Sequence, residues 1–249
     1  MTIGIIGVGH LAAAILAGLR GSGLAPAEVL LAPRGQGPAL AQAHGHGLAR
    51  SNADLVRACD IVLLAVRPKD AAEAIRGPPW RAGQVLLSAC AGVPLAALSA
   101  AAPARTARIM PITAAEIGRS PTVLFPDLAA AKPLLARIGP VIPVPSEADF
   151  ETATVSAAVY GWVQALVQRT AQWSAAQGLP PDAARALVAH TFAAAGQLIA
   201  EKPAPMADLL LALITPGGIT ERGLDVLRAQ GVPEAWDAAC DAVLARLRG

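Results

Sequence analysis

The first residues that could do chemistry are glycines close to the N-terminus. Gly7, Gly9 and Ala12 form a Gly-x-Gly-x-x-Ala run between an apolar stretch and an Ala-rich helical stretch. In such a turn the first glycine permits a tight bend, the second lets the backbone approach a pyrophosphate, and the small third residue lets the helix pack closely on the strand. The helix N-terminus offers free N–H groups to the phosphates. The run predicts a dinucleotide-binding site, with an ordinary glycine turn as the alternative.

Arg34 follows the second apolar run, where a protein that binds NAD carries an acidic residue. That residue lies roughly 20 positions beyond the glycines and binds the ribose 2′-hydroxyl. The sequence has Ala32-Pro33-Arg34-Gly35 instead. No carboxylate is present to repel a 2′-phosphate, and an arginine can bind one through two parallel hydrogen bonds. This favours NADPH over NADH, and a solvated surface arginine is the alternative.

A second glycine turn lies late in the chain, at Thr215-Pro216-Gly217-Gly218-Ile219-Thr220. Its small residues leave backbone N–H groups bare at the start of a helix, which suits binding of a substrate carboxylate. An ordinary Pro-Gly turn with Thr220 as the helix N-cap fits the same string, and the residues alone do not decide between the two.

The elements that position these turns follow from apolar patterning. From Met1 to about Phe150, short apolar runs alternate with Ala-rich helical stretches, which predicts a parallel sheet covered by helices. The runs lie at residues 3–6, 29–31, 61–66, 85–87, 107–110, 123–125 and 141–142. Several lack polar alternation, as strands buried on both faces do.

Beyond residue 150 the pattern is helical throughout. The helices are expected at residues 151–176, 181–201, 205–213, 218–230 and 233–247. Residues 152–200 carry too few charges for two long helices to have a polar, solvent-exposed face in an isolated bundle. We therefore expect this half to dimerise, with packing against the sheet domain as the alternative.

Composition excludes several classes of protein. With 54% hydrophobic residues and a net charge of +2, the chain is neither disordered nor a polyanion binder, so no nucleic-acid partner is expected. The three cysteines form no disulfide framework or zinc motif, which indicates a reducing cytoplasm. No stretch of about 20 apolar residues suggests a membrane span. His44 and His46 lack a third ligand, so we expect a surface loop there and no metal.

With these motifs in view, the chain resembles the pyrroline-5-carboxylate reductases over nearly all of its length. Seven strings fall in the order and at the spacing of that family. They are residues 7–12, 51–52, 60–68, 89–92, 108–111, 178–180 and 215–220. The resemblance implies an α/β Rossmann-type parallel sheet domain over residues 1–150, followed by an all-α dimerisation domain over residues 151–249. The latter interlocks with its copy in a homodimer, with a higher oligomer as an alternative.

The resemblance also assigns roles to single residues. Asn52 is expected near the adenosine end of the cofactor, Cys90 as a pocket wall, and Thr220 as a hydrogen-bond partner of the substrate nitrogen. The residues expected to bind NADPH are Gly7, Gly9, His10, Leu11, Ala12, Arg34, Asn52, Val66, Arg67, Pro68, Ala89, Cys90, Met110 and Pro111. Those expected to bind substrate are Thr215, Gly217, Gly218, Ile219 and Thr220.

Three segments depart from the family pattern. Ile112 stands where the family has asparagine, Ser156-Ala157-Ala158-Val159-Tyr160 replaces Ser-Gly-Ser-Gly-Pro, and Pro33 replaces the asparagine before the arginine. The first two changes fall where the family shapes its substrate pocket. Tyr160 is either a general acid for the imine nitrogen, a role that contributes about 10²- to 10⁴-fold, or a helix tyrosine with a buried ring and a wet hydroxyl.

Three functions are consistent with these residues. The first is NADPH-dependent reduction of a cyclic imine that carries a carboxylate, with 1-pyrroline-5-carboxylate going to proline as the first candidate and with Thr220 and Tyr160 as the candidate catalytic residues. The second keeps the fold and cofactor but reduces another imine or a ketone in a remodelled pocket. The third is a non-catalytic protein that binds NADPH.

Overall fold

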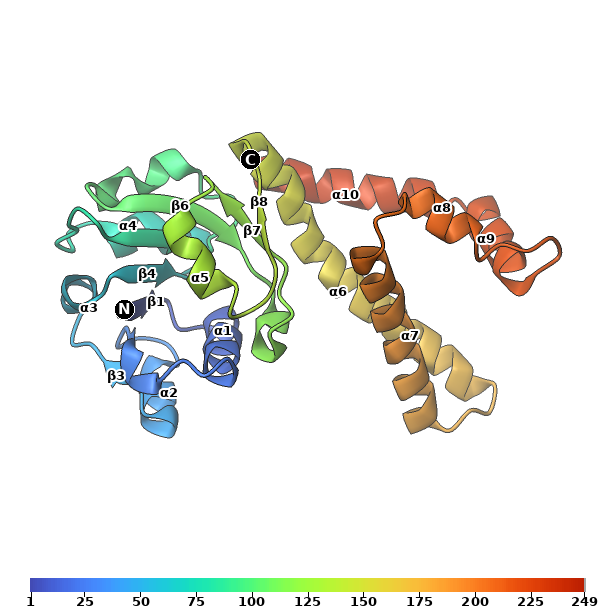
Figure 1. Ribbon diagram of the computed structural model, residues 1–249, viewed down its shortest axis with the longest axis horizontal. Coiled ribbons are helices and arrows are strands. Elements are labelled where there is room, and N and C mark those ends of the chain that lie inside the picture. The colour runs from blue at the N-terminus through green and yellow to red at the C-terminus, as the bar shows by residue number, and fades with distance from the viewer. Residues whose placement is uncertain (249) are drawn as a thin grey trace. The chain divides into compact units, whose positions relative to one another are not determined.

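The computed structural model of the protein describes residues 1–248, which form two compact units (Figure 1). Unit 1 comprises Met1–Ala157 together with the C-terminal residues from Leu244, and unit 2 comprises Ala158–Val243. A sheet with helices is followed by a region of helices alone, as predicted. The division expected at residue 150 falls inside a helix that begins in unit 1 and continues into unit 2.

An eight-stranded sheet lies at the centre of unit 1, in the order β3-β2-β1-β4-β5-β6-β7-β8. Its strands are β1 Ile3–Ile6, β2 Val29–Leu31, β3 Gly47–Leu48, β4 Ile61–Leu64, β5 Val85–Ser88, β6 Arg105–Met110, β7 Thr122–Phe125 and β8 Val141–Pro143. Strands β1 to β6 run parallel to one another, whereas β7 is antiparallel to β6 and β8 is parallel to β7. Every predicted run overlaps a strand, although the run at residues 61–66 extends two residues beyond the end of β4. The sheet is not parallel throughout, and β3 was not predicted.

The central strands β1, β4 and β5 are buried on both faces of the sheet, as their largely apolar sequences without polar alternation predict. On one face Ile3 and Ile5 pack in a cluster that includes side chains of α1 (His10–Gly21) and α5 (Lys132–Leu135). On the other face Ile6 packs in a cluster with side chains of α3 (Asn52–Ala58) and α4 (Ala71–Ile75). Helix α2 (Gly37–His44) also belongs to this unit.

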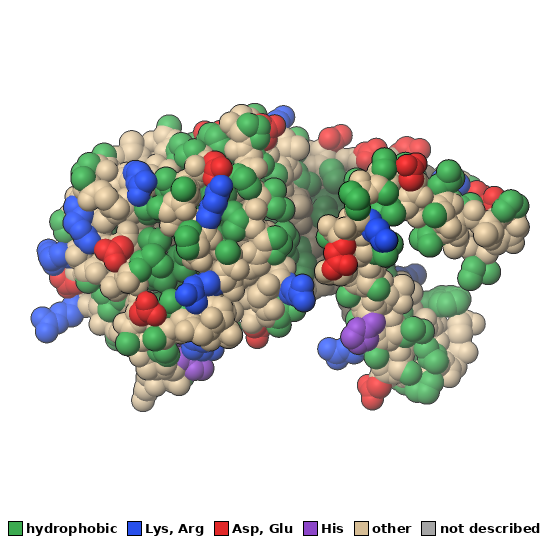
Figure 2. Space-filling model, viewed as in Figure 1, with side chains coloured by type: hydrophobic (Ala, Val, Ile, Leu, Met, Phe, Trp, Pro, Cys, Tyr) green, Lys and Arg blue, Asp and Glu red, His purple; other side chains and the backbone are tan. Residues whose placement is uncertain are grey.

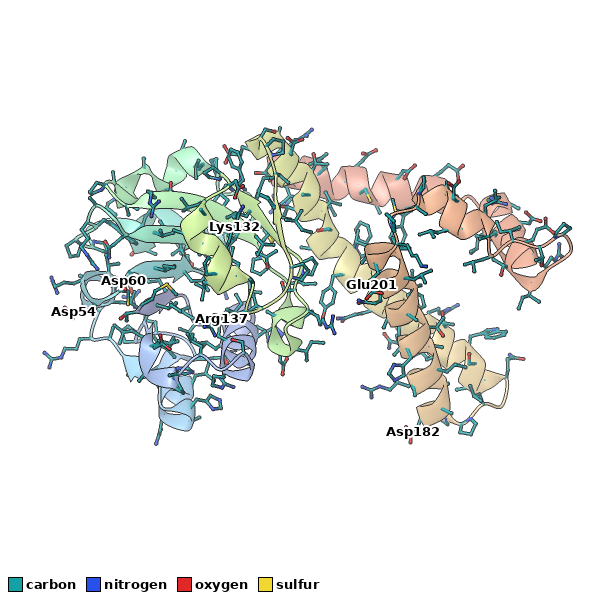
Figure 3. The ribbon with its side chains drawn as sticks, in the orientation of Figure 1. Asp54, Asp60, Lys132, Arg137, Asp182 and Glu201 are labelled. Carbon is teal, nitrogen blue, oxygen red and sulfur yellow. The ribbon has the colours of Figure 1, made fainter. Side chains whose placement is uncertain are left out.

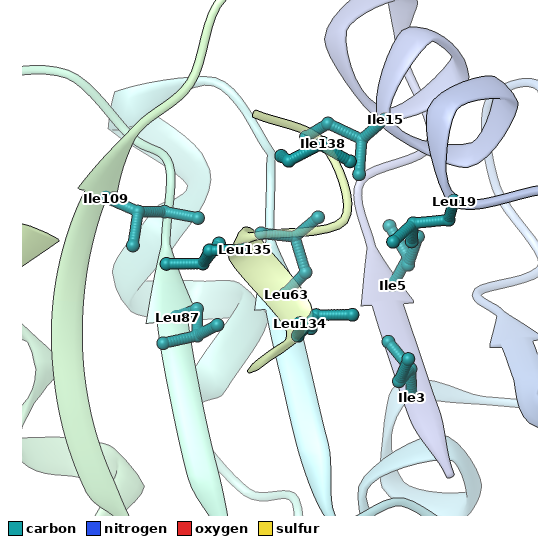
Figure 4. A pocket seen from close by; sticks show the side chains of 10 residues that line it. All are labelled: Ile3, Ile5, Ile15, Leu19, Leu63, Leu87, Ile109, Leu134, Leu135 and Ile138. Carbon is teal, nitrogen blue, oxygen red and sulfur yellow. The ribbon is translucent and has the colours of Figure 1, made fainter. Parts of the chain in front are cut away.

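The first of these clusters encloses a void of about 10 Å³, lined only by isoleucine and leucine side chains (Figure 4). The void has room for about one water molecule, and it offers that molecule no polar partner. It is a packing defect in the core and has no part in binding.

Five helices follow the sheet: α6 Glu147–Ala176, α7 Pro181–Glu201, α8 Met206–Leu211, α9 Ile219–Ala229 and α10 Val232–Arg248. They correspond to the predicted helices, but α6 begins four residues earlier than the expected start at Glu151. The earlier start has a local cause, since the Ser146 hydroxyl accepts a hydrogen bond from the Asp149 N–H at 3.1 Å and so caps the first turn. No helix within residues 1–248 is long and apolar enough to cross a membrane.

Unit 2 buries little of its apolar surface. Within α7 only Ala184 and Val188 are buried, and none of the described residues of α8, α9 or α10 is. Large apolar side chains are instead exposed along these helices, among them Met206 at 70% and Leu211 at 68% (Figure 2). An apolar surface of this kind is expected of helices that are covered by another chain.

A buried arginine joins the sheet to the first turns of α6. Arg108 on β6 is 1% exposed, and its Nη1 lies 2.8 Å from Glu147 Oε1 and 2.5 Å from Glu151 Oε1. The guanidinium also lies 4.4 Å from the centre of the Phe150 ring. A buried charge needs such partners, because its hydration is lost on folding.

Replacing Glu151 by glutamine is therefore expected to lower the free energy of unfolding by about 3 kcal/mol, since the buried Arg108 would lose a charged partner. Urea unfolding at fixed protein concentration measures this. The control is Asp127→Asn, because the Asp127–Lys132 pair is exposed on the same unit, with Lys132 labelled in Figure 3, and should contribute less than about 1 kcal/mol. Equal losses in the two variants would contradict the assignment.

Candidate functional site

Most of the residues predicted to bind cofactor lie at one edge of the sheet. Because β1 to β6 are parallel, their carboxyl ends meet at the same edge. Gly7 follows β1, Arg34 follows β2, Val66 follows β4 and Ala89 follows β5, while Met110 ends β6. The chain crosses from one side of β1 to the other between β3 and β4, and this switch point is where sheets of this class bind ligands.

The first glycine turn lies at this switch point. Its two glycines are required for different reasons. Gly7 has a φ of +88°, and a Cβ there would lie 2.6 Å from atoms of Ala65 and Val66, so packing requires glycine. Gly9 has no atom within 4 Å of its Cβ position, so packing within the chain does not require glycine at that position. A bare backbone beside open space fits the close approach of a phosphate.

Helix α1 begins at His10, which is followed by Leu11, and no side chain caps its N-terminus. Gly9 is the N-cap and provides no side-chain hydrogen bond, and no acidic residue lies in the first turn. The N–H groups of that turn and the positive end of the helix dipole therefore remain available to an anion. Ala12 is fully buried, which lets the helix lie close to the sheet. This arrangement fits the pyrophosphate of a dinucleotide.

A cleft of about 690 Å³ opens beside the turn. It is walled by residues that follow β1, β2, β3 and β4 and by the end of α4, and the predicted residues among them are Gly7, Arg34, Asn52 and Val66. The Asn52 side chain donates a hydrogen bond of 3.3 Å to the carbonyl oxygen of Ala74, so it ties the start of α3 to the end of α4. Asn52 thereby holds two walls of the cleft together.

Two further arginines line the same cleft and were not predicted. Arg50 follows the two-residue strand β3, and Arg76 follows α4. A strand as short as Gly47–Leu48 produces no hydrophobic run, so no sequence pattern predicts that Arg50 lies at the edge of the sheet. Asp70 and Glu73 also line the cleft.

Beyond the switch point, Ala89 and Cys90 follow β5 and Met110 ends β6. Cys90 is 3% exposed, and its thiol donates to the Val66 carbonyl oxygen at 3.3 Å. Burial raises the pKa of the Cys90 thiol, which keeps it protonated and unreactive. Arg67 is exposed, Pro68 begins a short 3₁₀ turn, and Pro111 directly follows β6.

The late glycine turn belongs to unit 2, and some of its backbone N–H groups already donate hydrogen bonds within the chain. The Gly217 N–H donates to the Glu221 carboxylate at 2.7 Å, and the Gly218 N–H donates to the Thr215 carbonyl oxygen at 2.8 Å. Two of the amides expected to be bare are therefore engaged. Among residues 1–248, the N–H groups of Ile219 and Thr220 at the start of α9 have no acceptor.

Two other predicted positions differ in exposure. Tyr160, in the part of α6 that belongs to unit 2, is half-buried. His46 was expected in a surface loop but is 7% exposed, and its Nδ1 lies 3.2 Å from the Pro26 carbonyl oxygen. Residues 1–248 contain no group of three or more potential metal ligands.

Comparisons with known proteins cover both halves of the chain. The family description "Pyrroline-5-carboxylate reductase dimerisation" matches residues 147–249, and "NADP oxidoreductase coenzyme F420-dependent" matches residues 2–92. Pyrroline-5-carboxylate reductase 2 of Bacillus subtilis is 29% identical over 94% of this chain and 89% of its own length. The enzyme of Pseudomonas aeruginosa is 27% identical over 98% of this chain and 94% of its own.

A solved structure agrees with this likeness from end to end. The 1-pyrroline-5-carboxylate reductase of Streptococcus pyogenes superposes with a TM-score of 0.87 at 26% identity, covering 100% of this chain and 98% of that one. The structure thus shares its fold with that enzyme, while its two halves match one description of an NADP oxidoreductase and one of a reductase dimerisation region. The chain is thus similar to pyrroline-5-carboxylate reductases from end to end and is an NAD(P)H-dependent oxidoreductase.

Proposed function

We propose that the protein reduces a cyclic imine that carries a carboxylate, with 1-pyrroline-5-carboxylate going to proline as the first candidate. The observation that carries the proposal is that one chain combines an uncapped glycine turn at the switch point of the sheet with a dimerisation region of the reductase family. Relatives named for this reaction match 94% or more of the chain.

NADPH is the cofactor, as the match of residues 2–92 to an NADP oxidoreductase family supports. The first-turn amides of α1 hold its pyrophosphate, and Arg34 holds its 2′-phosphate. When bound, NADPH supplies a hydride to the imine carbon. Ala89, Cys90 and Met110 form an apolar wall beside the nicotinamide, and a protonated thiol in that wall adds no charge to it.

The late turn binds the other reactant. The free amides of Ile219 and Thr220 and the dipole of α9 bind the substrate carboxylate, and the Thr220 hydroxyl orients the substrate nitrogen. Holding the ring by its carboxylate fixes the imine carbon in a near-attack geometry. Because a protonated imine is already a strong electrophile, little further acid is needed, and Tyr160 or water supplies the proton where the imine arrives neutral.

The protein acts as a homodimer in this proposal. Residues 147–249 match a dimerisation domain, and the exposed apolar side chains of α7 and α8 supply surface for a second copy. The assembly takes place in the cytoplasm, where the three cysteines stay reduced.

Two residues favour a second candidate function, reduction of another imine or of a ketone. Ile112 removes an amide near the predicted nicotinamide wall, and Glu221 adds a carboxylate within the turn expected to bind one. A substrate without a carboxylate would leave the Glu221 contact intact.

The substrate is tested by following NADPH oxidation with pyrroline-5-carboxylate and with 1-pyrroline, which lacks the carboxylate. We expect kcat/KM to be higher for the acid by about 10²-fold or more, because the amides of the turn would otherwise lose their charged partner. A preference for 1-pyrroline or for a ketone would favour the second candidate. Tight binding of NADPH without turnover of any substrate would favour a non-catalytic protein.

Thr220→Ala is expected to lower kcat by about 10- to 100-fold, since the substrate nitrogen would lose a hydrogen-bond partner, while the Kd for NADPH stays unchanged. Thr220→Ser keeps the hydroxyl and should restore most of the rate. Thr191→Ala is the control, because that hydroxyl bonds within α7 to the Leu187 carbonyl. A serine variant as slow as the alanine variant would exclude a role for the hydroxyl.

Glu221→Ala is expected to lower KM for the carboxylated substrate by about 3- to 10-fold. The change frees the Gly217 N–H and removes a like charge from the turn, and it should leave KM for 1-pyrroline unchanged. Glu201→Ala is the matched control, because Glu201 is an exposed carboxylate at the end of α7 (Figure 3). A rise in KM on losing Glu221 would mean that this carboxylate helps to bind the substrate.

A further inference from the structure

Three arginines from three separate elements line the cleft beside the first glycine turn. Arg34 follows β2, Arg50 follows β3 and Arg76 follows α4. All three side chains are exposed. The proposed function uses only Arg34, so the other two cations have no assigned role.

The parallel pairing of β2 with β3 explains why Arg34 and Arg50 share one wall. Leu31 pairs with Leu48 in this register, so Arg34 lies three residues and Arg50 two residues beyond paired positions. The segments that follow β2 and β3 both leave the sheet at its carboxyl edge, where the adenosine end of a dinucleotide binds.

Arg76 lines the cleft from the segment after α4, where the backbone is restrained. The carbonyl oxygens of the two preceding residues each accept a side-chain hydrogen bond, Ala74 from Asn52 at 3.3 Å and Ile75 from Trp80 Nε1 at 2.9 Å. The segment is therefore held at both α3 and the buried Trp80 ring. A fixed backbone directs the Arg76 side chain to the cleft with a smaller loss of entropy on binding.

The three guanidinium groups have no partner of their own among residues 1–248, where no ion pair or side-chain hydrogen bond engages them. Arg57 and Arg81, outside the cleft, are by contrast each paired with an aspartate. Unpaired cations gathered on one cleft favour an anionic ligand.

The 2′-phosphate of NADPH is such an anion. A phosphate monoester carries a charge of about −1.5 to −2 at pH 7 and has three acceptor oxygens. One guanidinium can bind two of these oxygens, which leaves an oxygen and most of the charge without a partner. The pyrophosphate, the other anionic group of the cofactor, is accounted for by the N-terminus of α1.

We propose that Arg50 and Arg76 bind the 2′-phosphate together with Arg34 and so determine the preference for NADPH over NADH. The proposal rests on the proposed function, which places this phosphate at Arg34. An alternative role for the same side chains, stacking on the adenine ring, would contribute to both cofactors alike.

Binding without turnover tests the proposal. Calorimetry gives the Kd of wild type, Arg34→Ala, Arg50→Ala and Arg76→Ala for NADPH, NADH, adenosine 2′,5′-bisphosphate and 5′-AMP. Each variant should lose about 10-fold or more for the two ligands with a 2′-phosphate and less than about 2-fold for the other two. Arg57→Ala, an exposed arginine on α3 outside the cleft, should change none of them.

The outcomes separate this proposal from the function on which it rests. If Arg34→Ala discriminates between the cofactors and neither Arg50→Ala nor Arg76→Ala does, the proposal is overturned and the cofactor assignment stands. If all three fail to discriminate, the phosphate does not bind in this cleft. Equal losses for NADPH and NADH would indicate stacking on adenine. Thermal melting of each variant confirms that it is folded, and Arg50→Lys and Arg76→Lys should retain part of the preference because they keep the charge.

Discussion

The parallel register of β1 to β6 is the constraint on which the cofactor site depends. Parallel strands end at a common edge, and every turn that leaves this edge adds a residue to the same surface. Residues far apart in the sequence, from Gly7 to Pro111, are thereby collected along one line. The sheet can hold this register only because both of its faces are buried under helices, so the apolar strands that stabilise the fold also position the site.

The stability of unit 2 depends on a different factor, the covering of its exposed apolar side chains. Its helices have apolar side chains that one chain leaves exposed, and few of its described residues are buried. A region of this composition gains stability chiefly when a second copy covers it, because burial of apolar area is the main favourable term in association. Dimerisation is therefore tied to these helices.

The sequence was sufficient to predict the strands β1, β2 and β4 to β8 and the five helices of the second half, because long apolar runs and Gly-Pro breaks are local signals. It did not indicate β3, which is two residues long, or the antiparallel pairing of β7, which depends on partners distant in the sequence. The start of α6 at Glu147 depends on the Ser146 cap, which is a polar signal and forms no part of the apolar pattern that predicts the helix. The arginines Arg50 and Arg76 at the cleft of unit 1 follow from the fold and from no motif. The same is true of the contact between Glu221 and Gly217 in unit 2.

The two glycines of the first turn divide folding from ligand capture. At position 7 any side chain collides with neighbouring backbone, so a substitution harms the native state itself. At position 9 a methyl group meets nothing within the chain. If the turn holds the pyrophosphate as proposed, a side chain there would block nucleotide binding in a protein of normal abundance and melting behaviour, a defect that no survey of stability would detect.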